Sequence, residues 1–376
     1  MNDVVMEVST PKELVLAICF AKNAFLKSVK ICVDNTAGNF NKTINEDIQD
    51  AIIGMYSLEC GYFSTAQTKS YAFKILFDAS GSFAKIYLKT DYMSSEKERN
   101  DFTCIAAEIS ELLLTECGLW ANDFQKIAKF SSWVKKNFDY KITNTYKDYS
   151  AVELLRNRTG VCQAIAALAV KVLPYMGIET QYISGQGYGT SGWGKHAWNI
   201  VKTDGRWIHV DFTFALNSLL VPMTDNNFNL KMFEKTHQWN SDLLSEEAIV
   251  ARSALFHEIE KSEILLIENE KYFMIHGVKI FTEIPIYMNT GDKEYISVGD
   301  MVRYLGGACE LNPSTDTMRI CVGGRIMTVN DALSLLNPDI AAFDRSILDI
   351  CGIRNVKYKN KLILTFAKTA VLNDNC

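Results

Sequence analysis

The spacing of apolar and polar residues divides the first 117 positions into helices and strands. Thr10-Pro11-Lys12-Glu13, followed by apolar residues every three or four positions, predicts a helix that begins at Pro11. The run 28–34 predicts a strand, and residues 45–58 predict a second helix. Two alternating runs, 71–77 and 83–88, predict a β-hairpin, and a long helix is expected over 94–116. We therefore expect residues 1–117 to form an α+β N-terminal region.

The middle of the chain carries helical patterns first and strand patterns afterwards. Helical spacing covers 122–137, a short segment that ends near Asn157, and an apolar run from Cys162 that stops at Gly177. Strand patterns cover 180–183, 194–201 and 206–213. Residues 184–194 hold five glycines, and we expect a mobile loop because a packed element does not tolerate that many.

The pattern of predicted elements changes after about residue 275. Residues 296–324 read as strand, helix, strand and turn, and residues 343–364 repeat a helix, a glycine and a strand pair. We expect 271–376 to form a separate small α+β domain with a weak internal repeat. The predicted organisation is thus an N-terminal region 1–117, a central domain 118–270 and a C-terminal domain 271–376.

Composition narrows the class of protein. A chain of 376 residues, with 48% hydrophobic and 22% charged residues, predicts a globular protein of two or three domains. The net charge of -5 gives no basic field, so we expect no nucleic-acid partner. No run approaches the roughly 18 apolar residues of a membrane span, and the N-terminus lacks the basic and apolar regions of a signal peptide.

The cysteines carry a further indication about compartment and cofactors. Ten cysteines are scattered through the chain without a CxxC pair or a zinc-ligand spacing. This spacing predicts no metal site, and we expect no cofactor. We interpret most of the cysteines as buried free thiols, which favours a reducing compartment or an anaerobic source. The compartment itself stays open.

One cysteine differs from the others because it follows a glycine turn and opens a helix rich in small residues. A thiolate at a helix N-terminus is stabilised by free N–H groups and the helix dipole, so Cys162 is the candidate nucleophile. His196 and Asp211 follow on two strand-like runs, in the order expected for a base and the group that orients it. Each residue alone is more often structural, and only their combination indicates a catalytic triad.

The spacing of the two strands tests this combination. If residues 194–201 and 206–213 form a hairpin around Asp204-Gly205, His196 and Asp211 lie on one face as diagonal neighbours. His209 shares that face and is the alternative base, whereas we interpret His237 as structural. The candidate substrate contacts are Trp193, Gly194 and Gln163.

These residues carry a resemblance. Gly160-Val-Cys162-Gln, Lys195-His196-Ala-Trp-Asn-Ile-Val and Gly205-Arg-Trp-Ile-His-Val-Asp211-Phe-Thr-Phe resemble the core motifs of the transglutaminase-like superfamily, over roughly 120–240. The approach to the cysteine, Trp133 to Tyr140, and the segment Phe228 to Trp239 also look like that family. Phe212 departs from the proline that the family commonly has. The resemblance implies a papain-like α+β fold, with the cysteine-bearing helix packed on an antiparallel sheet that bears the histidine and the aspartate.

The resemblance also implies a function. Cys162 is the nucleophile, His196 the base and Asp211 its orienter, in an enzyme that acts on peptide or side-chain amide bonds of a peptide or protein substrate. Hydrolysis by a cysteine protease or amidase is our first interpretation, because nothing in the sequence marks an amine acceptor. Glutamine–lysine cross-linking is the alternative, and a non-catalytic scaffold with the same fold is the third.

A second resemblance concerns the C-terminal domain. Tyr295-Ile-Ser-Val-Gly-Asp-Met-Val-Arg-Tyr-Leu-Gly-Gly-Ala and Leu311-Asn-Pro-Ser-Thr-Asp-Thr-Met-Arg-Ile are similar to the N-terminal-like domain of copper amine oxidases. Neither stretch contains histidine, so the resemblance brings no copper. It implies an interaction or spacer module that contacts a protein or the cell envelope. It also favours a location outside the cell, in conflict with the missing signal segment and the free cysteines.

Overall fold

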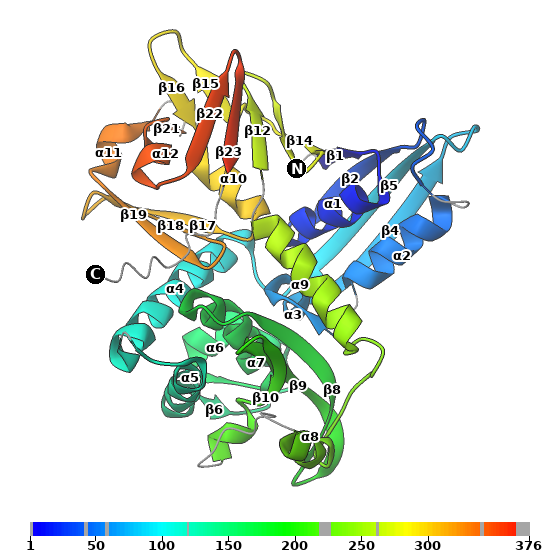
Figure 1. Ribbon diagram of the computed structural model, residues 1–376, viewed down its shortest axis with the longest axis vertical. Helices are drawn as coiled ribbons and strands as arrows, with labels where there is room; N and C mark the ends of the chain where they lie inside the picture. Colours follow the sequence, from blue (N-terminus) through cyan, green and yellow to red (C-terminus); the bar gives the residue numbers. More distant parts are fainter. Residues whose placement is uncertain are drawn as a thin grey trace. The chain divides into compact units, whose positions relative to one another are not determined.

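The chain folds into two compact units, and neither is one continuous stretch. The computed structural model describes residues 3–40, 44–56, 60–118, 120–217, 227–260, 263–338 and 342–365 (Figure 1). The first unit holds Met1–Met55, Tyr71–Thr90 and Ser253–Cys376, and the second holds Tyr56–Ser70 and Asp91–Arg252.

The first unit is built on a nine-stranded sheet of order β22-β23-β12-β13-β14-β1-β2-β5-β4. Its strands are β1 (Val4–Val8), β2 (Ser28–Asp34), β4 (Thr68–Phe77), β5 (Phe83–Tyr92), β12 (Glu263–Ile267), β13 (Tyr272–Ile275), β14 (Val278–Phe281), β22 (Arg354–Tyr358) and β23 (Lys361–Thr365). The strand at 28–34 and the hairpin that follows are therefore confirmed.

This sheet corrects the expected division into three consecutive segments. β1 pairs in parallel with β2 and antiparallel with β14, where Met6 lies opposite Ile280. Both Met6 and Ile280 are fully buried. Strands from the two ends of the chain thus share one sheet, joined through their backbones, and their buried side chains belong to one core. A boundary at 117 or at 270 does not separate them.

The first unit also holds two smaller sheets, β15-β16-β21-β20 and β17-β18-β19. Their strands are β15 (Tyr287–Asn289), β16 (Glu294–Ile296), β17 (Ala308–Asn312), β18 (Thr317–Val322), β19 (Arg325–Asn330), β20 (Leu336–Asn337) and β21 (Ala342–Asp344). The helices are α1 (Pro11–Asn23), α2 (Ile44–Tyr56), α10 (Val298–Tyr304), α11 (Ala332–Leu335) and α12 (Ile347–Ile350). The helix predicted from Pro11 is confirmed, since Thr10 Oγ1 accepts from Glu13 N at 3.2 Å as its N-cap.

The second unit combines helices with a five-stranded sheet. Its helices are α3 (Phe63–Ala66), α4 (Glu96–Cys117), α5 (Asp123–Asn137), η1 (Tyr146–Tyr149), α6 (Ala151–Asn157), α7 (Cys162–Val172), η2 (Leu173–Met176), η3 (Phe214–Asn217) and α8 (Asn227–Glu234); α9 (Glu246–Glu260) crosses its last boundary. The sheet runs β10-β9-β8-β11, with β3 also on β8. Its strands are β3 (Cys60–Gly61), β8 (Thr180–Gly189), β9 (Gly192–Thr203), β10 (Arg206–Val210) and β11 (His237–Gln238), and a separate pair is β6 (Asp139–Tyr140) with β7 (Thr159–Gly160). The chain is mixed α+β, as predicted.

The glycine-rich segment is not the expected loop. β8 and β9 pair antiparallel without a break, from Thr180 opposite Val201 to Gly189 opposite Gly192. Two of the glycines are needed because rings press against the strand. A Cβ at Gly185 would lie 2.2 Å from Gln238 O and 2.8 Å from the Trp198 ring, and one at Gly187 would lie 2.7 Å from His196 Cγ. Gly185 and Gly187 therefore mark close packing within a paired strand.

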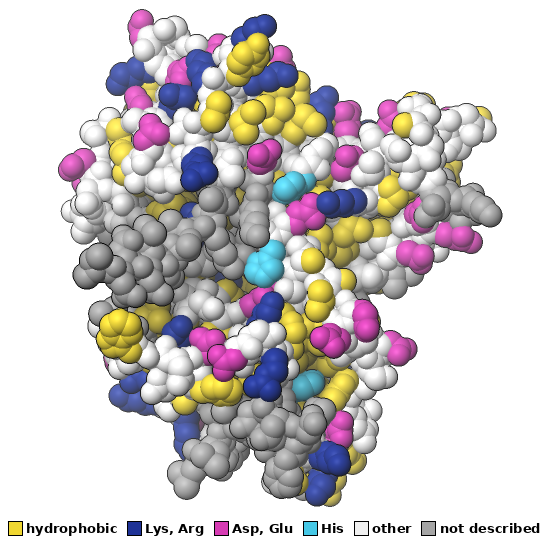
Figure 2. Space-filling view, in the orientation of Figure 1, with side chains coloured by type: hydrophobic (Ala, Val, Ile, Leu, Met, Phe, Trp, Pro, Cys, Tyr) yellow, Lys and Arg dark blue, Asp and Glu magenta, His cyan; other side chains and the backbone are white. Residues whose placement is uncertain are grey.

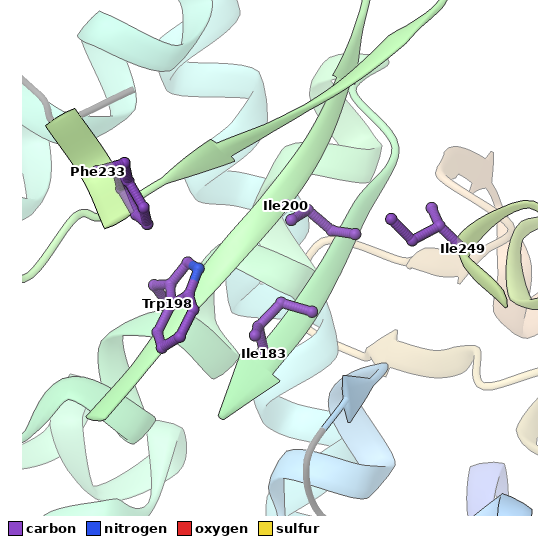
Figure 3. Close-up of a cluster of buried hydrophobic side chains, with 5 residues drawn as sticks. All are labelled: Ile183, Trp198, Ile200, Phe233 and Ile249. Carbon is purple, nitrogen blue, oxygen red and sulfur yellow. The ribbon is translucent and has the colours of Figure 1, made fainter. Parts of the chain in front are cut away.

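The two faces of β9 are covered by different partners. Asn199 Nδ2 donates to Ala166 O at 2.9 Å, which holds α7 against the strand. On the other face Trp198 and Ile200 form a buried apolar cluster with Ile183, Phe233 and Ile249 (Figure 3). The strand is accordingly buried on both faces from His196 to Val201.

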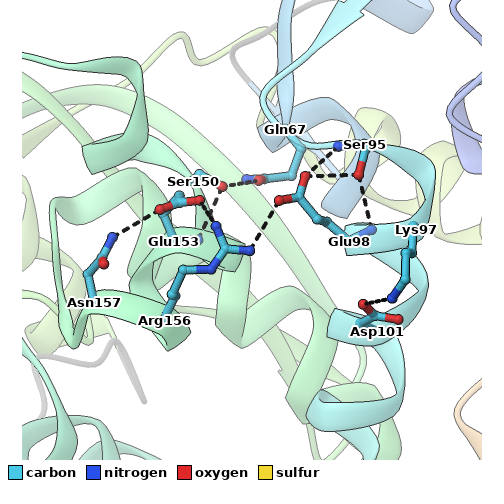
Figure 4. A network of polar contacts seen from close by, with 9 residues as sticks. All are labelled: Gln67, Ser95, Lys97, Glu98, Asp101, Ser150, Glu153, Arg156 and Asn157. Atoms are coloured by element: carbon cyan, nitrogen blue, oxygen red, sulfur yellow. Dashed lines mark hydrogen bonds and ion pairs between the residues drawn. The ribbon is translucent and has the colours of Figure 1, made fainter.

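A polar network fixes the short helix that precedes Cys162. Arg156 of α6 donates to Glu98 Oε1 at 3.1 Å and also pairs with Glu153, whose second oxygen accepts from Asn157 at 3.0 Å (Figure 4). Glu98 also closes the capping box of α4 with Ser95. α6 is thereby tied to the start of α4.

The surface carries both signs of charge. On the face shown in Figure 2, lysines and arginines are interspersed with acidic residues, and no large patch of one sign forms. Among the helices of the described residues, none is long and apolar enough to cross a bilayer. Among the cysteines whose side chains the structure describes, four are buried: Cys19, Cys104, Cys162 and Cys321.

Candidate active site

Cys162 lies at the first position of α7, where a parallel strand pair delivers it. β7 pairs with β6 so that Gly160 lies opposite Tyr140, and Val161 N donates to Asp148 O at 3.0 Å. A Cβ at Gly160 would lie 3.2 Å from Asp148 O, so glycine allows this close approach. Cys162 is 7% exposed. The first N–H groups of α7 lack acceptors within the helix and are directed toward its N-terminal end, where the thiol lies.

His196 and Asp211 are brought together by the predicted hairpin. Asp204 and Gly205 form the turn with φ of 48° and 76°, and the pairing runs from Thr203 opposite Arg206 to Asn199 opposite Val210. This is the register expected from the sequence. Asp211 follows β10 directly, and His196 Nε2 lies 2.7 Å from Asp211 Oδ2. The two side chains therefore share a hydrogen bond.

The Asp211 carboxylate is fully buried and receives four hydrogen bonds. Oδ1 accepts from the backbone N–H groups of Thr213 at 2.8 Å and Phe214 at 3.0 Å. Oδ2 accepts from His196, and from His237 Nε2 at 2.9 Å. Burial opposes ionisation, but the hydrogen bonds from the two histidines outweigh it and hold the pKa of Asp211 well below its usual range.

The charge of His196 follows from the same contacts. Burial lowers the pKa of a histidine, yet hydrogen bonds to Asp211 and to Cys162 outweigh this effect and raise the pKa of His196 to about 10. Because Nε2 contacts Asp211, Nδ1 is the ring nitrogen left for the thiol. At neutral pH the imidazole is thus protonated between a carboxylate and the thiol sulfur.

Tyr140 is a residue of this site that the sequence did not single out. Its hydroxyl hydrogen-bonds the Cys162 thiol, and burial together with the charge of Cys162 raises the pKa of Tyr140 to about 12. The hydroxyl therefore keeps its proton at physiological pH and remains a donor. Its position in the motif-like run Trp133 to Tyr140 was the only signal available.

The other two histidines on this side of the sheet have different partners. His209 Nδ1 accepts from Trp198 Nε1 at 2.9 Å, and burial, followed by the charge of His237, lowers the pKa of His209 to about 3. His209 is therefore bonded to Trp198 of the apolar cluster, whereas His196 is the histidine that contacts Asp211. His237 contacts Asp211, a connection that the sequence did not predict.

The candidate substrate contacts fall in three different settings. Trp193 is 41% exposed, and its ring meets that of Tyr188 edge to face at 5.4 Å. Gly194 lies opposite Gly187 in the same ribbon, with open space where a Cβ would be. Gln163 Nε2 donates to Ala66 O at 2.8 Å, which ties α7 to α3. In the structure the Gln163 side chain therefore forms a hydrogen bond between two helices.

Three side chains also meet the spacing of a metal site. His196, Asp211 and His237 each offer one ligand atom, and these atoms lie within 4.8 Å of one another. Two of these separations are the hydrogen bonds to Asp211 Oδ2, at 2.7 and 2.9 Å. A carboxylate shared by two imidazoles accounts for the cluster without an ion.

Comparisons with known proteins were made for sequence and for structure. Residues 117–212 match the family model Transglut_core, the transglutaminase-like superfamily. No curated protein matches the chain in sequence.

Similar solved structures include a proposed cysteine protease from Cytophaga hutchinsonii (17% identity, 45% of this chain and 76% of that one, TM-score 0.26). A second is described as a TGase (12% identity, 50% and 51%, TM-score 0.27). A third is a proposed protease from Parabacteroides distasonis (13% identity, 48% and 39%, TM-score 0.23). TM-scores of this size do not establish a common architecture. The family match does cover the cysteine, the histidine and the aspartate, and the chain therefore carries a transglutaminase-like core over residues 117–212.

Proposed function

We propose that the protein is a cysteine-dependent acyl-transfer enzyme that hydrolyses peptide or side-chain amide bonds. The observation that carries the proposal is the position of His196, with Nε2 2.7 Å from Asp211 Oδ2 and a hydrogen bond to the Cys162 thiol. A nucleophile, a base and a group that orients the base are what nucleophilic catalysis requires. The transglutaminase-like core supports a peptide or protein substrate.

The chemistry follows from the contacts. The Cys162 sulfur, as thiolate, attacks the amide carbonyl carbon and forms a carbon–sulfur bond. The Cys162 backbone N–H and the Tyr140 hydroxyl are the proposed donors to the developing oxyanion. The intermediate collapses as the carbon–nitrogen bond breaks, and His196 gives its proton to the leaving amine.

Water completes the reaction. It attacks the thioester carbonyl while His196 takes its proton, and the carbon–sulfur bond breaks to release the acid and the thiolate. Asp211 holds the imidazole in place through both steps. A primary amine in place of water would give the cross-linking reaction instead.

The experiment supplies a panel of glutamine-containing peptides with and without a primary amine, and follows the products by mass spectrometry. We expect the free acid, or the cleaved peptide, in both cases, and none from Cys162→Ser. A dominant amide-linked product would replace hydrolysis by transfer. Absence of any product across the panel, with Cys162 no more reactive than the other cysteines, would favour the non-catalytic scaffold.

For residues 271–376 we propose a contact with another protein or the cell envelope, on the sequence resemblance alone. Edge strand β22 offers Val356 and Tyr358, which are 63% and 65% exposed. Val356→Lys with Tyr358→Lys should weaken binding of the purified protein to envelope fractions or to a co-purifying protein. Equal binding by the wild-type protein and the double variant would place the contact outside β22.

A further inference from the structure

His237 is a fully buried histidine that the proposed reaction does not use. It is 1% exposed, and its Nε2 lies 2.9 Å from Asp211 Oδ2, the oxygen that also receives His196. It lies outside the residues matched by the family model, which end at 212. A polar group buried so completely is kept in a fold when its hydrogen bonds are satisfied, so its partners indicate its role.

A short strand brings His237 to this place. β11 pairs antiparallel with β8, with His237 opposite Gly187 and Gln238 opposite Gln186. Gly187 is also the residue whose missing side chain leaves room for the His196 ring. The His237 ring stacks on Phe233, with 3.7 Å between the centroids and 13° between the planes. Backbone pairing and stacking together hold the imidazole in one orientation.

The protons on the two imidazoles follow from the acceptor between them. An ionised carboxylate can only accept hydrogen bonds, so Nε2 of His196 and Nε2 of His237 both carry a proton. The other nitrogen of His237, Nδ1, lies 2.9 Å from Thr236 Oγ1 and 3.3 Å from Phe233 O. The Thr236 hydroxyl also donates to Phe233 O at 3.1 Å. These contacts hold the ring at Nδ1, while Nε2 donates to Asp211.

We propose that His237 is a positioning residue that fixes the Asp211 carboxylate and, through it, the imidazole of His196; this inference rests on the proposed function. The carboxylate is anchored at Oδ1 by two backbone N–H groups and at Oδ2 by the two imidazoles. Loss of the His237 donor leaves a buried acceptor with one partner fewer and lets the His196 pair shift. Such a loss costs about tenfold to a hundredfold in a rate that depends on this geometry.

Two variants separate positioning from packing. His237→Phe keeps a ring on Phe233 but removes the donor, whereas His237→Gln keeps an N–H near the same place. Each is compared with the wild-type full chain for kcat, KM and the pH dependence of Cys162 alkylation by iodoacetamide. EDTA is present throughout, because the three donor atoms could also hold a divalent cation.

We expect His237→Phe to lower kcat tenfold to a hundredfold with KM unchanged and to shift the alkylation profile, and His237→Gln to recover most of the loss. Wild-type kcat and profile in His237→Phe would overturn the inference. Equal impairment in both variants with an unshifted profile would also overturn it, since packing alone would then be at work. Should His237→Phe not fold, Thr236→Val, which removes the hydroxyl contact of Nδ1, should shift the alkylation profile in the same direction, and an unchanged profile would count against the inference.

A second readout does not depend on turnover. The proton that His196 shares with Asp211 is expected as a strongly deshielded imidazole N–H signal in the NMR spectrum of the wild-type protein, displaced in His237→Phe and restored in His237→Gln. An unmoved signal would overturn the positioning role. If the signal follows this pattern across the three proteins while the wild-type protein converts no substrate, the proposed function fails and the inference about His237 stands.

Discussion

The most specific prediction concerns a glycine, Gly187, in the strand next to the candidate base. In Gly187→Ala the new methyl group would lie 2.7 Å from His196 Cγ, 2.8 Å from Cδ2 and 2.9 Å from Cβ. Ordinary carbon contacts need about 3.5–4.0 Å, so the ring has to move by roughly 1 Å. The hydrogen bond from Nε2 to Asp211 Oδ2 is 2.7 Å long, and a shift of this size away from the carboxylate breaks it.

The expected effect can be placed on a scale. A misplacement of about 1 Å at a catalytic group costs on the order of a hundredfold in rate, or about 2.7 kcal/mol of transition-state stabilisation. Overpacking in the folded protein costs about 1–3 kcal/mol of stability. We therefore expect kcat/KM on an amide substrate and the alkylation rate of Cys162 to fall about a hundredfold, with a lower Tm.

A matched control lies two residues along the same strand. A Cβ at Gly189 meets nothing within 4 Å, so Gly189→Ala makes the same chemical change without the clash. Gly189→Ala should keep wild-type kcat/KM and stability within about 1 kcal/mol. Wild-type kcat/KM and alkylation in Gly187→Ala, or an equal loss in both variants, would refute the reasoning from ring contact.

Three further predictions follow from the same geometry. Alkylation of Cys162 should slow in His196→Ala and stay near wild type in His209→Ala, measured by mass spectrometry; loss in His209→Ala alone would mean that the wrong histidine was chosen. NMR titration should give His196 a pKa of about 10, so that its protonated form is lost as pH rises through that value. The pKa of His196 should be lower in Cys162→Ala, because one of the contacts that raise it is gone. An unchanged pKa in the variant would exclude the thiol as a cause. Tyr140→Phe should lower kcat about tenfold to a hundredfold, with little change in Tm, because a proposed oxyanion donor beside the thiol is lost; an unaltered kcat would exclude the hydroxyl from oxyanion binding.

Local patterns in the sequence were sufficient for the elements that carry the candidate triad. The helix that begins at Cys162 and the hairpin around Asp204-Gly205 were predicted, because helical spacing and a two-residue turn are both local signals. Once the turn was known, strand parity alone placed His196 near Asp211.

Contacts between distant segments could not be predicted in this way. β11 has only two residues, which is too short for a periodic pattern. The sequence therefore does not predict that His237 lies beside Gly187 and contacts Asp211. Gly185 and Gly187 of β8 were misread for the same reason, since the rings that press on them come from β9. The pairing of β1 with β14 likewise joins segments far apart in the chain, and no local signal predicts it.

Whether Cys162 is an activated nucleophile is the question on which the proposal depends. The direct measurement is competitive labelling of all ten cysteines with limiting iodoacetamide near neutral pH, read out by peptide mass spectrometry. We predict that Cys162 is modified well ahead of the other nine, although it is buried, because its sulfur contacts the His196 imidazole that Asp211 holds in place. Modification of Cys162 at or below the rate of the other cysteines would contradict the account.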